Sequence, residues 1–150
     1  MTKIYLAGKM TGLSKEEMNG WREQLNYLIS LKAKSHLHDA VQVINPVNFY
    51  NTADEPMYQS DKEYIRWEFD RVKNSNIVIV GWNKEQDSLG TMAELTYAYA
   101  NNIPVILYFY DRKDNDCYLP LHPFVNYIAS KIYFKDQIEE LANYVVKYYC

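Results

Sequence analysis

Residues 76–82, which read NIVIVGW, form the apolar run that decides the fold class. The β-branched residues Ile77 to Val80 follow one another without an alternation of polar and apolar positions. Such a run is typical of a strand that is buried on both faces of a parallel sheet. We therefore predict a strand over 76–82 within an α/β domain.

Similar short apolar runs lie on both sides of this stretch, and helical patterns separate them. Further strands are predicted over 4–7, 41–44, 104–109 and 131–134. Helices with apolar stripes of period 3.6 are predicted over about 14–34, 60–75, 91–101 and from 138 to the end. This alternation indicates right-handed βαβ units. We predict one domain over 1–150, an α/β flavodoxin-like three-layer sandwich with a five-stranded parallel sheet in the order 2-1-3-4-5.

The amino-acid composition argues against several classes of function. The 150 residues carry a formal charge of −3, which argues against binding of a nucleic acid polymer but is compatible with binding of one nucleotide. No stretch approaches the roughly 20 apolar residues of a membrane span, and no secretory signal is recognisable. The two cysteines have neither disulfide nor metal spacing. We expect a cytoplasmic protein without a metal or cofactor, in which the sequence HLHD at 36–39 is a solvated turn.

Ligands of such folds bind at the carboxyl ends of the strands, where the strand order reverses. That place lies between the first and third strands, so the loops at 8–13 and 83–90 are expected to form the site. In the first loop, Gly8 lets backbone N–H groups approach an anion and Lys9 adds a positive charge. The alternative is a glycine turn that only leaves the strand.

The second loop continues into a helix as DSLGTMAE at 87–94. We place Glu94 in the first turn of that helix, where the N-terminus favours the ionised carboxylate that a nucleophile requires. The alternative is structural, because Thr91 and Glu94 match the spacing of a capping box.

Asp70 is the second candidate carboxylate. Its structural alternative is an i,i+4 salt bridge with Arg66. However, Asp70 is predicted near the C-terminal end of its helix, where a negative charge is unfavourable, and this favours another role.

Together these segments resemble the nucleoside 2-deoxyribosyltransferase superfamily, which includes 2′-deoxynucleoside 5′-monophosphate N-hydrolases. The resemblance covers most of the chain. It is carried by IYLAG at 4–8, Asp70 ahead of NSNIVIV at 74–80, SLGTMAE at 88–94, YAYA at 97–100 and IPV at 103–105.

The resemblance implies a role for each candidate residue. Glu94 would be the nucleophile at C1′ of the sugar, and Asp70 the partner carboxylate that holds the sugar or protonates the departing base. Tyr5 would orient the nucleophile, and Gly8 would line the substrate pocket. A residue from another subunit, for which Asn126 is one candidate, would complete the site of a homodimer or larger homo-oligomer.

Two departures from the family bear on the substrate. Leu89 stands where transferases often have a base-contacting aspartate, and Asp87 lies two positions earlier. The serine and glycine of Ser88-Leu89-Gly90 resemble the phosphate-binding pair of the monophosphate hydrolases. Lys9 would add charge to such a site without the bidentate fork of an arginine.

The sequence thus predicts an enzyme that cleaves an N-glycosidic bond, with three functions in order of preference. The first is transfer of the deoxyribosyl group of a nucleoside to another base through a Glu94 glycosyl-enzyme intermediate. The second is hydrolysis of a nucleoside 5′-monophosphate. The third is a non-catalytic nucleotide-binding protein, which the fold alone does not exclude.

Overall fold

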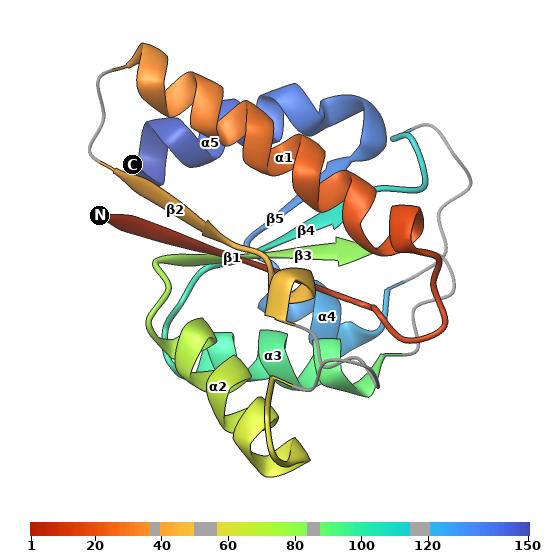
Figure 1. Ribbon diagram of the computed structural model, residues 1–150. Helices are drawn as coiled ribbons and strands as arrows, with labels where there is room; N and C mark the ends of the chain where they lie inside the picture. The colour runs from red at the N-terminus through yellow and green to blue at the C-terminus, as the bar shows by residue number, and fades with distance from the viewer. Residues whose placement is uncertain (37–39, 50–56, 84–87, 115–120) are drawn as a thin grey trace.

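The computed structural model describes residues 1–36, 40–49, 57–83, 88–114 and 121–150, which form three layers with a sheet in the middle (Figure 1). All four strand pairings are parallel, and the strand order is β2-β1-β3-β4-β5. The strands are β1 (Thr2–Gly8), β2 (Val41–Ile44), β3 (Ile77–Trp82), β4 (Val105–Phe109) and β5 (Lys131–Phe134). The predicted three-layer fold and strand order are confirmed.

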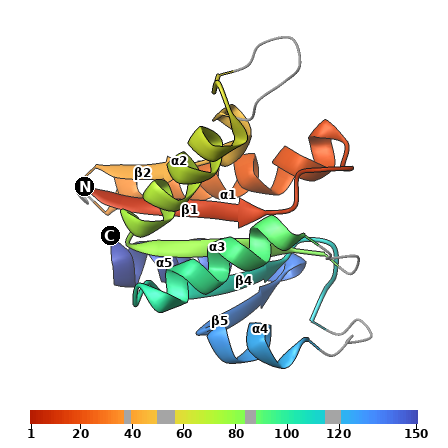
Figure 2. The same ribbon diagram turned by 90° about the horizontal axis from the view of Figure 1, so that it is seen from below.

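Two helices cover one face of the sheet and three cover the other (Figures 1 and 2). The first layer holds α1 (Lys15–Ser35) and α5 (Ile138–Tyr149); the second holds α2 (Asp61–Lys73), α3 (Leu89–Ala100) and α4 (Pro123–Ile128). Short 3-10 turns η1 (Pro46–Phe49) and η2 (Lys135–Gln137) complete the described elements. α4 and η1 were not predicted. η1 lies within a stretch whose sequence is typical of a long loop, and α4 follows a second stretch of this kind.

The pleat of β1 sends alternate side chains to opposite layers. Ile4 and Leu6 pack with α1 and α5, whereas Tyr5 and Ala7 pack on the side of α2 and α3. β1 lies between β2 and β3, so its carboxyl end is where the strand order reverses. Tyr5 therefore faces the layer that holds α2 and α3.

α1 packs closely on the central strand because β3 contains a glycine. A Cβ atom added to Gly81 would lie 2.3 Å from the Trp21 ring. Trp21 also stacks on Tyr110, with ring centroids 5.8 Å apart. The missing side chain at Gly81 thus makes room for the indole between the helix and the sheet.

Capping residues determine where the helices begin. Ser14 and Glu17 form the predicted capping box of α1. For α3 the prediction was wrong: Ser88, rather than Thr91, is the N-cap, and the Ser88 side chain accepts a hydrogen bond from the Thr91 N–H. Glu94 consequently lies in the second turn of α3, where the field of the helix terminus is weak.

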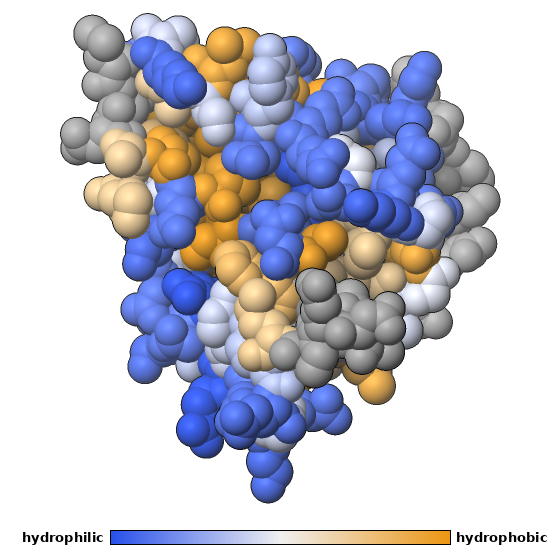
Figure 3. All heavy atoms as spheres, in the orientation of Figure 1, coloured by the Kyte–Doolittle hydropathy of each residue, from blue (hydrophilic) through white to orange (hydrophobic). Residues whose placement is uncertain are grey.

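The outer surface is mostly hydrophilic in the view of Figure 3, with hydrophobic side chains showing between the charged ones. Within the residues that the structure describes, no helix is both long and apolar enough to cross a bilayer.

Candidate active site

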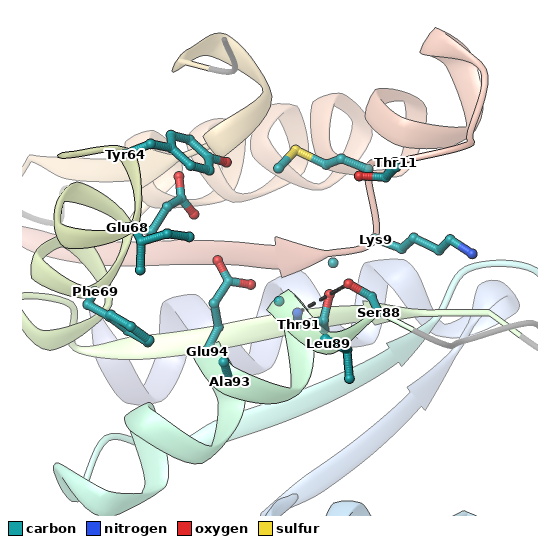
Figure 4. Close-up of a pocket in the computed structure, with 14 residues that line it drawn as sticks. Lys9, Thr11, Tyr64, Glu68, Phe69, Ser88, Leu89, Thr91, Ala93 and Glu94 are labelled. Carbon is teal, nitrogen blue, oxygen red and sulfur yellow. Dashed lines mark hydrogen bonds between the residues drawn. The ribbon is translucent and has the colours of Figure 1, made fainter. Parts of the chain in front are cut away.

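Three side chains from three elements meet beside the end of β1. The Tyr5 hydroxyl donates a hydrogen bond of 2.6 Å to Oε1 of Glu94 on α3, and it is also bonded to Oε2 of Glu68 on α2. Tyr5 is fully buried, Glu68 is 5% exposed and Glu94 is half-buried. Figure 4 shows Glu68 and Glu94 pointing from their helices into the same space. The fold thus brings two carboxyl groups to one phenol.

The number of protons on these three side chains limits which of their contacts can be hydrogen bonds. A phenol has one proton to donate, whereas an ionised carboxylate only accepts. Tyr5 therefore cannot donate to both Glu68 and Glu94 at once, and both contacts are hydrogen bonds only if one carboxyl group is protonated. The cluster is built to hold one negative charge rather than two.

Burial and mutual repulsion act on the same groups. Burial raises the pKa of Glu94 well above the ordinary value of 4.5, the contact with Glu68 raises this pKa further, and the Tyr5 hydroxyl and Arg22 oppose the shift. Burial and both carboxylates also raise the pKa of Tyr5 well above 10, so the phenol keeps its proton at neutral pH. Perturbed acids of this kind gather at functional sites.

The carboxyl pair lies in a cavity of about 620 Å³, a size suited to a nucleoside-sized ligand. The cavity lies between the end of β1, α2 and the start of α3 (Figure 4). The lining residues are Gly8, Lys9, Met10, Thr11, Tyr64, Ile65, Glu68, Phe69, Ser88, Leu89, Gly90, Thr91, Ala93 and Glu94. Aromatic and aliphatic walls thus surround one acidic centre.

Most of the predicted substrate-binding residues line this cavity. Gly8 and Lys9 come from the end of β1, while Ser88 and Gly90 come from the start of α3. The Lys9 side chain extends away from the two carboxyl groups, on the side of Ser88 (Figure 4). Asp87 lies outside the described residues. The two loops selected from topology therefore do border one cavity.

Asp70 is not placed with Glu94. Its side chain is exposed on α2, accepts a 3.1 Å hydrogen bond from the Asn74 amide, and lies outside the cavity. Glu68, which the sequence analysis missed, contacts Tyr5 in its place. A signal was available, because Glu68 precedes the buried Val72 by four residues and so shares its inward face.

The start of α3 forms the polar end of the cavity. The Ser88 hydroxyl accepts hydrogen bonds from the Thr91 N–H at 3.2 Å and from the Thr91 hydroxyl at 2.9 Å. The N–H groups of Leu89 and Gly90 belong to the first helical turn and have no partner within the helix. They are suited to an anion that enters the cavity from this end.

Two further positions lie outside this cluster. Asn126, the candidate for completing a neighbouring site, is exposed on α4 and does not line the cavity of its own chain. Residues 37–39 of the HLHD stretch lie outside the described part of the chain. Within the described ranges, no three His, Cys, Asp or Glu side chains are arranged to hold a metal ion.

A comparison with known protein families identifies the family of this chain. Residues 1–111 match the model of the family described as "Nucleoside 2-deoxyribosyltransferase like". The chain therefore belongs to this family, and the match includes β1, α2 and α3, which carry Tyr5, Glu68 and Glu94. A search of curated proteins finds no match.

Solved structures confirm the fold at low sequence identity. The Clostridium botulinum CMP N-glycosidase BcmB is 18% identical, with a TM-score of 0.58, and the match covers 98% of this chain and 99% of that one. A 2-deoxyribosyltransferase from Bacillus psychrosaccharolyticus is also 18% identical, with a TM-score of 0.69 and coverages of 95% and 92%. A conserved protein from Enterococcus faecalis is likewise 18% identical, with a TM-score of 0.73 and coverages of 98% and 98%.

Proposed function

We propose that the protein cleaves the N-glycosidic bond of a nucleoside or deoxynucleoside and transfers the sugar through a covalent intermediate on Glu94. The observation that carries this proposal is the Glu94 carboxyl group, which lies in the cavity, is hydrogen-bonded to Tyr5 and faces a second carboxyl group. Family membership supports the same class of reaction.

The separation of the two carboxyl groups favours a covalent route. Glu68 and Glu94 contact one hydroxyl oxygen, so they lie no more than two hydrogen bonds apart. Retaining glycosidases place their carboxyl groups roughly 5–5.5 Å apart, whereas inverting enzymes need about 6.5–9.5 Å to admit a water molecule. The short separation of Glu68 and Glu94 matches the retaining arrangement, in which the nucleophile attacks C1′ directly.

The first half-reaction starts from the state in which Glu94 is ionised and accepts the hydrogen bond of Tyr5, while the one proton that the carboxyl pair shares lies on Glu68. A Glu94 oxygen bonds to C1′ as the bond from C1′ to the base nitrogen breaks. The electron pair of the broken bond goes to the base, which takes the proton of Glu68. In the second half-reaction, the nitrogen of another base attacks C1′, loses its proton to Glu68 and returns the electron pair to Glu94.

A second candidate is hydrolysis of a nucleoside 5′-monophosphate, in which water replaces the second base. The start of α3 favours it, because Ser88 and the N–H groups of Leu89 and Gly90 border the cavity. A 5′-phosphate at this end would interact with the helix terminus, with Lys9 adding positive charge. The sugar would then lie between the phosphate and Glu94.

One assay distinguishes the candidates. The protein is incubated with deoxynucleosides, ribonucleosides and their 5′-monophosphates, with and without a free acceptor base. Base exchange supports transfer, free sugar phosphate supports the hydrolase, and binding without product supports a non-catalytic nucleotide-binding protein. Rapid quenching followed by peptide mass spectrometry should find the sugar on the peptide that contains Glu94. Full activity of Glu94→Ala would overturn the mechanism.

A homodimer or larger oligomer remains part of the proposal. Two apolar residues at the mouth of the cavity support it, because Leu89 is 86% exposed and Ile65 is 47% exposed. Light scattering coupled to size exclusion should give a mass above the 17.8 kDa of one chain, and a strictly monomeric active enzyme would contradict it.

A further inference from the structure

A buried positive charge lies beneath the floor of the cavity. Arg22 of α1 is fully buried, and its guanidinium donates to the Gly8 carbonyl at 2.9 Å, to the Leu6 carbonyl at 3.2 Å and to the Met18 carbonyl. Within the part of the chain that the structure describes, Arg22 forms no ion pair. A buried guanidinium that contacts only neutral acceptors is costly to maintain, which indicates that its charge has a use.

The contacts of Arg22 connect it to the site. Leu6 and Gly8 belong to the same strand as Tyr5, and Gly8 lines the cavity. A Cβ atom at Gly8 would lie 3.0 Å from Nη2 of Arg22, so the glycine is what allows the guanidinium to come this close. The guanidinium also lies over the Trp21 ring, 4.6 Å from its centroid. Arg22 thus holds the strand end that carries Tyr5 and Gly8.

The charge of Arg22 reaches the carboxyl pair. Burial lowers the pKa of Arg22 to about 10, and attraction to Glu94 is the largest of the effects that oppose this shift. At neutral pH the guanidinium therefore remains charged. By the same interaction, Arg22 opposes the rise in the pKa of Glu94 that burial and Glu68 produce.

We propose that Arg22 is a positioning residue of the active site, which holds the end of β1 through its hydrogen bonds to the Leu6 and Gly8 carbonyls and places a positive charge behind the carboxyl pair. The proposal rests on the proposed function only in taking Glu94 as the nucleophile. Arg22 lies on the opposite side of β1 from Glu94 and acts through the strand and through the electric field, without touching substrate.

The first test measures Glu94 directly and needs no turnover. In protein labelled with ¹³C at the glutamate carboxyl carbons, the Glu94 signal is assigned by its loss in Glu94→Gln. Arg22→Gln keeps an amide donor but removes the charge. In this variant the midpoint of the pH titration of the Glu94 signal should rise by roughly one pH unit. In Arg22→Lys it should stay close to that of the unchanged protein. Lys34→Gln, which removes an exposed charge from the same helix, is the matched control and should leave the midpoint unchanged.

The second test covers the case in which the Arg22 variants fail to fold, because it uses the native Arg22. The interaction between Arg22 and Glu94 is reciprocal, so the Arg22 Nε–H resonance should shift as Glu94 titrates and stop shifting in Glu94→Gln. Slow solvent exchange of the same N–H would report its bond to Leu6. Two results would overturn the proposal: an Nε–H resonance that does not shift as Glu94 titrates, or an unchanged midpoint of the Glu94 titration in folded Arg22→Gln.

Activity then separates this proposal from the proposed function. If nucleosides are turned over, the acidic limb of kcat/KM should move to higher pH in Arg22→Gln but not in Arg22→Lys. If neither nucleosides nor their monophosphates react with the unchanged protein, the proposed function fails, while the two NMR tests still decide whether Arg22 controls the ionisation of Glu94.

Discussion

Tyr5 and Glu94 are joined by a hydrogen bond of 2.6 Å although 89 residues separate them in the chain. Tyr5 is fixed inside the sheet by β1, and Glu94 is carried to it by α3. The bond supports the anionic form of a carboxylate whose burial favours the neutral form. Glu68 adds a second carboxyl group at the same phenol.

The burial of Glu94 should cost stability. Because the pKa of Glu94 is raised in the folded state, the folded protein holds this proton more tightly than the unfolded chain, and stability falls as pH rises toward the folded pKa. Glu94→Gln, which has no charge to bury, should therefore melt at a higher temperature than the unchanged protein at pH 7. The difference should shrink at acidic pH, where Glu94 is protonated too. Glu140→Gln, an exposed substitution on α5, should show no such gain.

Glu68 and Asp70 offer a matched comparison on one helix. Glu68 is 5% exposed and contacts Tyr5, whereas Asp70 is exposed and contacts Asn74. Glu68→Gln should lower kcat by about 10²–10⁴-fold, as expected for loss of a general acid, whereas Asp70→Asn should change it little. Steady-state kinetics on both variants test this, and the reverse ranking would restore Asp70 as the partner carboxylate.

Removing the Tyr5 hydroxyl should weaken the nucleophile without removing it. Tyr5→Phe deletes a hydrogen bond to a charged group, worth about 1.5–3 kcal/mol, so kcat/KM should fall roughly 10–100-fold. Because this hydrogen bond lowers the pKa of Glu94, its loss should also move the acidic limb of kcat/KM to higher pH. An unchanged pH profile would show that Tyr5 does not act on Glu94.

The pH dependence of the unchanged enzyme has a defined sign. A nucleophilic Glu94 must be ionised, and burial raises its pKa well above the ordinary value of 4.5. Activity should therefore be lost on acidification at a pH well above 4.5, and kcat/KM measured across the acidic range should show this. A profile that stays flat down to pH 4.5 would contradict the burial of the acidic cluster.

The close packing of α1 on β3 predicts a stability defect. In Gly81→Ala the new methyl group would overlap the Trp21 ring, which lies 2.3 Å from the Cβ position. We expect a loss of about 1–3 kcal/mol in the free energy of unfolding, as is usual when a packed core is overfilled. Gly20→Ala within α1 is the control: its Cβ would lie 3.8 Å from Glu16, so it should stabilise the protein. Urea titrations of both variants would measure whether each substitution lowers or raises the free energy of unfolding.

Sequence patterns predicted the elements that depend on local order. The run at 76–82 became β3, and the capping box of Ser14 and Glu17 opens α1. These features depend on side-chain periodicity and on backbone groups a few residues away, so they can be read along the chain. The start of α3 was misplaced because Ser88 and Thr91 are both good caps, and only the observed hydrogen bond distinguishes them.

The sequence by itself determined the fold class and the two loops that border the cavity, because apolar periodicity and short motifs are local properties. Only the tertiary structure decided which α2 carboxyl group faces Tyr5 and that Arg22 lies under the cavity floor. Both depend on the rotation of a helix against the sheet. A shift of two residues turns a helix by roughly 200° and so exchanges inward and outward positions, and the packing of the whole core sets this rotation.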